Sequence, residues 1–236
     1  FPVPEQEWAL WRLDMTINER GVECDWNLVW SAVRMLETES YVLVSEAIGL
    51  TGIENPRSVQ QLISWLEEET GEEVADLRKG TVAKMVEKLE PGKARRVLEI
   101  RQELSKSSTK KYAAMLETIC DDGRIRGLLQ FYGANRTGRW AGRLVQVQNL
   151  PRNSLPAIEL ARALAVRGDA AALKLLYGSL SDTLSQLIRT ALIARPFTRL
   201  HVADFSAIEA RVLAWLAGEQ WRIDVFRTHG KIYEAS

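Results

Sequence analysis

Residues 200–219 read LHVADFSAIEARVLAWLAGE, a stretch in which a strand pattern changes into a helix pattern. The first apolar residues are typical of a short strand: Leu200, Val202 and Phe205. The next apolar residues recur at helical spacing: Ile208, Val212, Trp215 and Leu216. The stretch therefore predicts a strand that runs into a helix, with Ser206 as N-cap and Gly218 at the helix end.

Asp204 stands at the predicted junction, and two interpretations apply to it and to Glu209. In the first, Asp204 is a turn residue, and Glu209 completes a capping box with Ser206 in the Ser-x-x-Glu pattern. In the second, Asp204 lies at a helix N-terminus, where backbone N–H groups and the helix dipole attract anions. A carboxylate there can hold a metal ion against a phosphate group. The spacing alone is compatible with both.

The composition is that of an ordinary globular protein, with 236 residues of which 46% are hydrophobic. No apolar run approaches the ~20 residues that a membrane helix needs, and no signal-peptide pattern is present. Cys24 and Cys120 lie far apart without metal-site spacing, so we expect buried or half-buried thiols in a reducing, cytoplasmic compartment. The chain begins with Phe1 instead of Met, which indicates a segment of a longer protein.

The net charge of zero conceals a strong segregation of charge along the chain. Residues 1–77 carry 4 basic and 16 acidic side chains, whereas residues 78–152 carry 17 basic and 7 acidic ones. The basic middle therefore has a local charge of +10. Such a segment is typical of a surface that binds a polyanion, and equally of a solvated helical face.

Helical periodicity dominates, so the predicted fold is mainly α with a small β-sheet. Gly21 is expected to end the first helix, Asp25 to cap the second, and Asn55 to cap the third with Pro56 at its first position. Further helices are predicted within the region that follows residue 152, separated by Gly168. The predicted helices before that region cover residues 5–20, 26–45, 56–66, 81–89, 93–104 and 107–119, and a strand covers residues 124–132.

The wording of residues 204–219 resembles the first palm motif of family A DNA polymerases, most closely that of phage and prophage members. The resemblance implies that Asp204 binds both catalytic Mg²⁺ ions. It also implies that Glu209 packs under the incoming sugar and excludes a 2′-hydroxyl group. Phe205 occupies a position that is often tyrosine in this family.

Residues 137–152 read TGRWAGRLVQVQNLPR and resemble the Thr-Gly-Arg segment and the Gln-Asn-x-Pro turn of the same family. The resemblance implies that Arg139 reaches the minor groove at the primer terminus while nearby amides contact template and primer. Minor-groove acceptors are nearly the same for all base pairs. Hydrogen bonds from these groups can therefore test whether a base pair has the correct shape without distinguishing which bases form it. Thr-Gly-Arg by itself is equally compatible with a surface turn. The nucleic-acid-binding residues expected here are Thr137, Arg139, Gln148, Asn149 and Arg152.

Residues 99–112 read EIRQELSKSSTKKY and resemble the thumb helices that grip the primer–template duplex in the family. Such helices meet phosphates without reading sequence. Tyr112 is expected to pack inside the protein. The residues expected to bind phosphates are Arg101, Lys106, Lys110 and Lys111.

The resemblance implies three parts: N-terminal helices over residues 1–50, a thumb-like region over 51–122 and a partial palm over 123–236. Residues 153–186 are longer than the usual connection between the two motifs, and they form a predicted helical insertion. The insertion could hold DNA, a partner or nothing.

The function implied is that of a segment of a DNA-dependent DNA polymerase, with primer–template DNA, deoxynucleoside triphosphates and Mg²⁺ as partners. In the family, the second catalytic aspartate and the fingers follow the region that ends here at Ser236, so this segment is expected to be inactive alone. One alternative is a non-catalytic helical DNA-binding or replication-scaffold module. Another is a helical adaptor whose acidic first third binds a protein.

Overall fold

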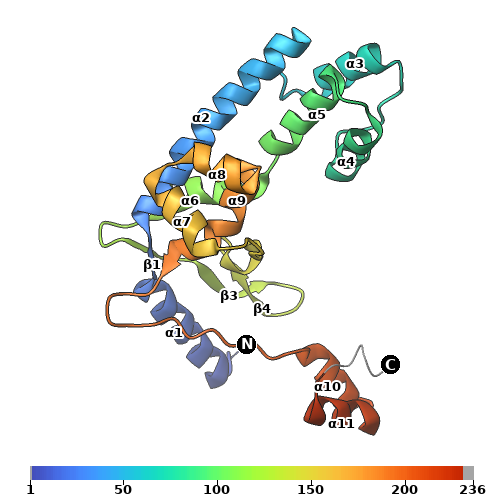
Figure 1. Ribbon diagram of the computed structural model, residues 1–236. Helices are drawn as coiled ribbons and strands as arrows, with labels where there is room; N and C mark the ends of the chain where they lie inside the picture. Colours follow the sequence, from blue (N-terminus) through green and yellow to red (C-terminus); the bar gives the residue numbers. More distant parts are fainter. Residues whose placement is uncertain (1, 231–236) are drawn as a thin grey trace. The chain divides into compact units, whose positions relative to one another are not determined.

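The computed structural model describes residues 2–230. It consists of two units that meet between Arg195 and Pro196, and each unit is described by itself. The prediction of a mainly α fold with a small β-sheet is confirmed (Figure 1). Among residues 2–230, no helix has both the length and the hydrophobicity needed to cross a membrane.

The first unit holds nine α-helices and five strands among its described residues. The helices are α1 (Glu5–Arg20), α2 (Trp26–Thr51), α3 (Val59–Thr70), α4 (Lys79–Lys88), α5 (Lys93–Leu104), α6 (Lys110–Thr118), α7 (Ile158–Arg167), α8 (Ala170–Tyr177) and α9 (Leu180–Leu187). The strands are β1 (Val22–Cys24), β2 (Arg124–Ile125), β3 (Leu129–Ala134), β4 (Arg139–Gly142) and β5 (Leu192–Ile193).

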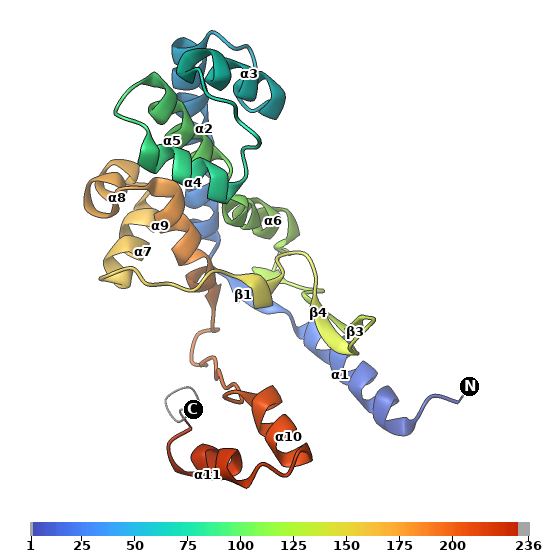
Figure 2. The same cartoon turned by 90° about the vertical axis from the view of Figure 1, so that its right-hand side faces the viewer.

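Helix α2 is the longest element, and other helices pack along it (Figures 1 and 2). Asp25 caps it as predicted, because its carboxylate accepts a hydrogen bond from the backbone N–H of Leu28 at 3.2 Å. The helix continues beyond the predicted end at Ser45 to Thr51, where Gly52 adopts the left-handed conformation that ends it. Gly49 does not interrupt the helix, so the prediction was six residues too short.

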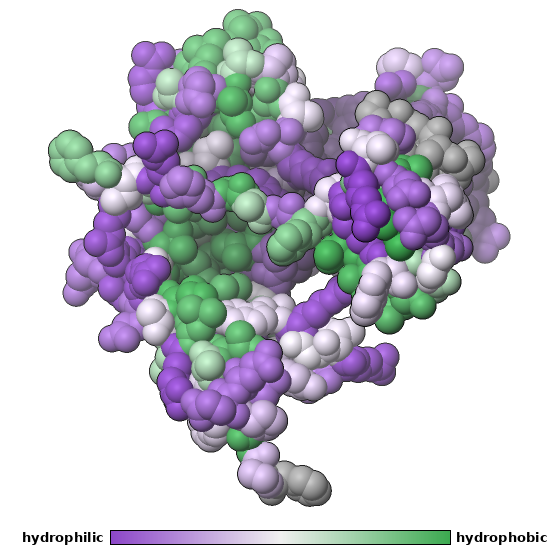
Figure 3. All heavy atoms as spheres, turned by 90° about the horizontal axis from the view of Figure 1, so that it is seen from below, coloured by the Kyte–Doolittle hydropathy of each residue, from purple (hydrophilic) through white to green (hydrophobic). Residues whose placement is uncertain are grey.

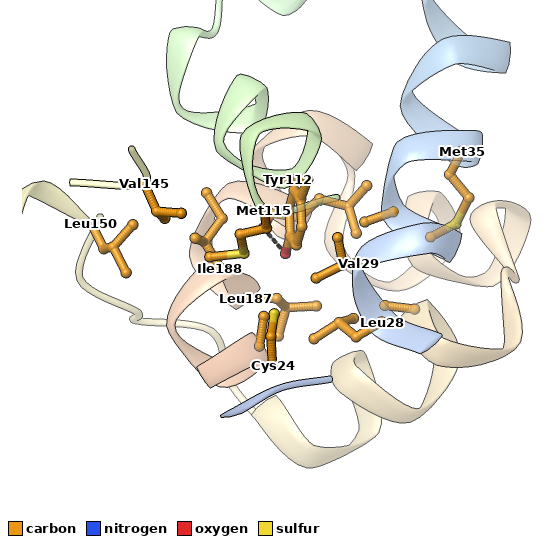
Figure 4. Packing of buried hydrophobic residues seen from close by; sticks show 14 of the residues in the cluster. Cys24, Leu28, Val29, Met35, Tyr112, Met115, Val145, Leu150, Leu187 and Ile188 are labelled. Carbon is orange, nitrogen blue, oxygen red and sulfur yellow. Dashed lines mark hydrogen bonds between the residues drawn. The ribbon is translucent and has the colours of Figure 1, made fainter. Parts of the chain in front are cut away.

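The largest core cluster joins the start of α2 to α6 and to the helices of residues 153–186. Tyr112 is fully buried as predicted, and its hydroxyl donates to the carbonyl oxygen of Leu184 at 2.8 Å. Figure 4 shows Tyr112 close to Met115 and Val29 within this cluster. Leu164, Leu173 and Leu184 of this segment are buried here, so α7, α8 and α9 are part of the core.

A second cluster lies at the far end of α2, where α3, α4 and α5 bury Leu62, Leu66 and Leu98 (Figure 2). The predicted cap of α3 was wrong. Ser58 caps this helix, and its hydroxyl accepts from the backbone N–H of Gln61 at 3.5 Å. Asn55 instead accepts from the N–H of Arg57, which forms a turn before the helix.

Two small antiparallel sheets complete the first unit. β1 lies between β2 and β5, pairing Val22 with Ile125 and Glu23 with Ile193. β3 and β4 form a hairpin with an irregularity between Gln130 and Ala134. The predicted strand over residues 124–132 therefore divides in two, because Gly127 has a φ of 69° and breaks the extended run.

The cysteines differ in their surroundings. Cys24 is buried, and burial together with the charge of Asp25 raises the pKa of its thiol to about 12. Cys120 is exposed, so the prediction of two buried or half-buried thiols is correct only for Cys24. Among the described residues both cysteines are free thiols. Figure 3 shows that hydrophobic residues reach the surface in several patches between hydrophilic ones.

The second unit contains helices α10 (Ile208–Leu216) and α11 (Gln220–Thr228), which pack against each other. The strand predicted before α10 is absent in the part of the chain that the structure describes. An isolated extended segment has no ladder of hydrogen bonds, and Val202 and Phe205 are 93% and 78% exposed. Gly218, with a φ of 68°, follows α10 as predicted.

Candidate nucleic-acid interface

One of the four predicted phosphate-binding residues, Lys110, lines a groove on the first unit. This groove, of about 790 Å³, lies between α2 and the start of α6 and is lined by both Arg57 and Lys110. The guanidinium of Arg101 donates to the backbone carbonyl of Arg57 at 3.4 Å, which brings a third cationic side chain to the same place. Lys110 is exposed at the N-terminus of α6. Arg57 and Lys110 are the cationic residues of a lining that also contains Glu37 and is otherwise mostly apolar.

Lys106 has a different environment, because α5 and the start of α9 supply acidic and polar partners. Its ammonium lies 2.5 Å from a carboxylate oxygen of Asp182 and 3.7 Å from one of Glu103, and it donates to Ser179 at 3.3 Å. The Lys106 side chain is only 22% exposed. Its charge is therefore largely balanced within the protein, and a phosphate must compete with Asp182 for it.

Lys111 is half-exposed, and its ammonium group contacts the protein backbone. Its Nζ atom donates to the backbone carbonyl of Val145 at 2.6 Å and lies 3.5 Å from that of Gln146. Burial lowers the pKa of the Lys111 ammonium because the charged form loses hydration. The contact joins α6 to the loop that leads toward Gln148 and Asn149.

Thr137 and Arg139 lie at the tip of the β3–β4 hairpin and are exposed. The N–H groups of Thr137 and Gly138 both donate to the carbonyl of Ala134, at 3.0 and 2.9 Å. Gly138 has a φ of 65°, and a Cβ atom there would meet the Tyr132 ring at 2.9 Å. The tight turn therefore fixes the start of β4, which carries Arg139.

Helix α1 supports the outer edge of this hairpin through polar side chains. Asp14 accepts a hydrogen bond from the N–H of Phe131 at 2.9 Å, and Asn18 both donates to and accepts from the backbone of Leu129. Asp14 is only 8% exposed. Sequence analysis missed both roles, although their spacing of four residues on one helix face was a usable signal.

The predicted amide-bearing turn forms a short 3-10 helix, Val147–Asn149, whose Gln148 and Asn149 side chains are exposed. A Cβ atom at Gly142 would overlap Oε1 of Gln148, so the Gln148 side chain lies directly against β4. Arg189 holds the next segment, donating to the carbonyls of Leu150 at 2.7 Å and Pro151 at 2.9 Å. Arg152, which follows this segment, is exposed.

The structure thus brings the second motif into one local arrangement. Lys111 and Arg189 hold the backbone on either side of the amide turn, while Gly142 admits Gln148. The sequence predicted Gln148 and Asn149 as ligand-binding groups, but it did not predict this supporting shell.

Asp204 and Glu209 belong to the second unit, and both are exposed. The predicted capping box is wrong. Ala207, not Ser206, is the N-cap residue of α10, with a φ of 51° and no side-chain cap hydrogen bond. Glu209 therefore occupies the second helical position, where a carboxylate still favours the positive end of the helix dipole. Ser206 instead accepts through its carbonyl from Arg211 at 2.7 Å.

The described residues offer few side chains that could bind a metal ion together. Among residues 2–230, no three His, Cys, Asp or Glu side chains gather closely enough to hold a metal ion. Asp204 is an exposed carboxylate just before a helix, and Mg²⁺ in proteins often takes only one or two carboxylates together with substrate phosphates. Asp204 therefore fits as one Mg²⁺ ligand of such a shared site.

Comparison with known proteins gives one family. A sequence model described as DNA polymerase family A matches residues 31–236. A protein named DNA polymerase, from Bacillus phage SP02, is 53% identical over all 236 residues. The chain covers 36% of the length of that relative. No solved structure matches the chain significantly.

Proposed function

Because this chain belongs to DNA polymerase family A, we propose that it is the primer–template-binding part of a DNA-dependent DNA polymerase. The whole protein then catalyses template-directed nucleotidyl transfer from deoxynucleoside triphosphates during DNA replication in the cytoplasm of a bacterial or phage-infected cell. Residues 51–122 serve as the thumb, residues 123–236 as the first part of the palm, and residues 1–50 lead into them.

The observation that carries this proposal is the amide turn beside the hairpin. Gln148 and Asn149 are exposed, while their backbone is held by buried neighbours and by Arg189. Rigid, exposed amides near an arginine suit hydrogen bonds to minor-groove acceptors, which are shared by all base pairs. In the proposal, Thr137, Arg139 and these amides contact the paired primer end.

The phosphate contacts of the proposal come from cationic side chains at or near the groove and from the segment after the turn. Arg101 and Lys110 meet the backbone of the duplex, and Arg152 extends this set. Lys106 joins them when it exchanges Asp182 for a phosphate. Contacts of this kind position DNA without reading its sequence.

The chemistry of the proposal depends on Asp204 and Glu209. The exposed Asp204 carboxylate would be one ligand of Mg²⁺, and the bound ions would neutralise negative charge that develops on the phosphates. Glu209 would lie beside the incoming sugar and exclude a 2′-hydroxyl group. Its position in the first turn of α10 supports a side chain that projects from an ordered helix end.

Fluorescence anisotropy with unrelated primer–template duplexes tests the binding part of this proposal. We expect weak, sequence-independent binding that falls steeply as the salt concentration rises. Lys110→Ala should reduce the slope of log affinity against log salt concentration by about 1, which is the contribution of one phosphate contact. Lys174→Ala is the matched control, because Lys174 is paired with Glu39 at 2.9 Å on the insertion and should leave the slope unchanged.

Absence of binding at low salt would contradict the proposal, as would an affinity that does not change with salt. A non-catalytic DNA-binding module predicts the same salt dependence, so a second measurement is required. Asp204→Asn in the longer polymerase separates the two, because only the polymerase proposal predicts loss of nucleotide incorporation with DNA affinity retained.

A further inference from the structure

Lys111 follows Lys110 in the sequence, yet the two lysines have different surroundings. Lys110 is exposed at the border of the groove. The ammonium of Lys111 is bound to two consecutive backbone carbonyls, at 2.6 Å from Val145 and 3.5 Å from Gln146. Hydrogen bonds from a charged donor are among the stronger ones in proteins. The charged group of Lys111 is therefore bound by the backbone of the protein itself.

The loop that Lys111 contacts has an unfavourable backbone conformation. Leu144 and Gln146 have φ angles of 54° and 53°, in the left-handed region that residues other than glycine rarely adopt. Val145 lies between them and is completely buried. Such a conformation persists where surrounding contacts hold it in place. Lys111 and the buried Val145 side chain supply two of these contacts.

The same loop begins the turn that carries the two amides. The carbonyl of Gln146 accepts the N–H of Asn149 at 2.9 Å as well as the Lys111 contact. The side-chain nitrogen of Asn149, Nδ2, also lies 3.5 Å from the side-chain oxygen of Gln146. A shift of Gln146 would therefore reorient both Gln148 and Asn149.

Lys111 is itself well anchored, since it directly precedes Tyr112 in α6. The buried Tyr112 ring and its hydrogen bond to Leu184 fix the first turn of this helix in the core. Lys111 thus connects the loop to the core, in addition to the buried Val145 side chain.

We propose that Lys111 is a positioning residue that holds residues 144–146, and through them the amides of Gln148 and Asn149, in the orientation that meets a paired primer end. This inference rests on the proposed function for what the amides bind. It gives Lys111 a role different from the phosphate contact that the sequence pattern predicts.

Hydrogen exchange in the 236-residue chain tests the structural step without DNA. Lys111→Met keeps the aliphatic stem and removes the donors, so the Asn149 N–H should exchange about tenfold faster. Lys110→Met, the neighbouring control, should leave this rate unchanged. Lys111→Arg restores a charged donor and should return the rate to within about threefold of the original. Unchanged exchange in Lys111→Met would overturn the proposal.

Anisotropy supplies the functional step, with duplexes that have a paired or a mismatched primer end. Lys111→Met should lower the affinity ratio between the two duplexes and preserve the salt slope, whereas Lys110→Met should lower the slope and preserve the ratio. A lowered slope with a preserved ratio in Lys111→Met would make Lys111 a phosphate-binding residue and overturn the proposal. If the unaltered chain binds no DNA, the proposed function fails, and the exchange rates still decide whether Lys111 holds the loop.

Discussion

Asn18 of α1 exchanges two hydrogen bonds with the backbone of Leu129 in β3. Its Nδ2 atom donates to the Leu129 carbonyl at 2.8 Å, and the Leu129 N–H donates to Oδ1 at 3.0 Å. An edge strand would otherwise present these groups unpaired. One side chain therefore does what a neighbouring strand would do, and it fixes the hairpin that carries Arg139.

Replacing Asn18 by alanine should lower the free energy of unfolding by about 1–3 kcal/mol, because two partly buried backbone groups lose their partners. Urea unfolding followed by circular dichroism measures this change. Asn27→Ala is the control, since Asn27 is exposed on α2 and its replacement should change stability by less than about 0.5 kcal/mol. Equal effects of the two replacements would contradict the assigned role of Asn18.

Replacing Gly142 by alanine should displace the Gln148 side chain rather than unfold the hairpin, because the overlapping atoms belong to the end of a flexible side chain. We expect a loss of primer–template affinity similar to that of Gln148→Ala. The double variant should lose little more than either single variant, since both remove the same contact. Additive losses in anisotropy measurements would show that Gly142 acts independently of Gln148.

Gly49→Ala is the control for the replacement of Gly142. Gly49 lies inside α2, and nothing lies within 4 Å of a Cβ atom placed there. Alanine should therefore raise the free energy of unfolding by about 0.5–1 kcal/mol and leave DNA affinity unchanged.

Replacing Glu209 by alanine tests its role in the longer polymerase. Ser206 is not the N-cap of α10, so we expect a stability loss of less than about 1 kcal/mol, the size of a helix-dipole interaction. If Glu209 lies beside the incoming sugar, the ratio of deoxynucleotide to ribonucleotide incorporation should fall, because space opens next to C2′. Single-turnover incorporation measures this ratio. An unchanged ratio would remove Glu209 from the proposed sugar-selecting site.

The elements with clear local signals were predicted well from the sequence. The predicted limits of α1 and α5 match the structure, because Gly21 ends the first and the Pro91-Gly92 pair separates α5 from α4. The start of α2 was predicted equally well because Asp25 is a strong cap. The order and type of most helices could therefore be derived from periodicity and helix ends.

The errors have physical causes that local patterns do not contain. Ser206 stands where a cap is expected, but the chain makes its left-handed turn one residue later, at Ala207. The strand pattern at residues 200–205 needs a pairing partner, and pairing is not encoded in a single segment. The burial of residues 153–186 depends on contacts such as those of Ser31 and Tyr112, which join residues far apart in the sequence.

The candidate site followed the same division. Arg139, Gln148 and Asn149 are exposed, and their role in binding stays a prediction that rests on the order of the motif. The residues that support these groups could not be predicted. Lys111 and Arg189 donate to backbone carbonyls, and every residue has such a carbonyl, so the sequence does not indicate which one is bound. The sequence likewise predicted Lys106 and Lys110 as equivalent phosphate-binding residues. In the structure Lys106 is paired with Asp182, whereas Lys110 is exposed.

A hydrogen-exchange footprint of the chain with and without primer–template DNA tests the central claim most directly. The account predicts slower exchange over residues 137–149, which include the hairpin tip and the amide turn, and little change in α8, on the insertion. The protection should disappear at high salt together with binding. DNA binding that leaves residues 137–149 unprotected, or that protects α8 instead, would contradict the account.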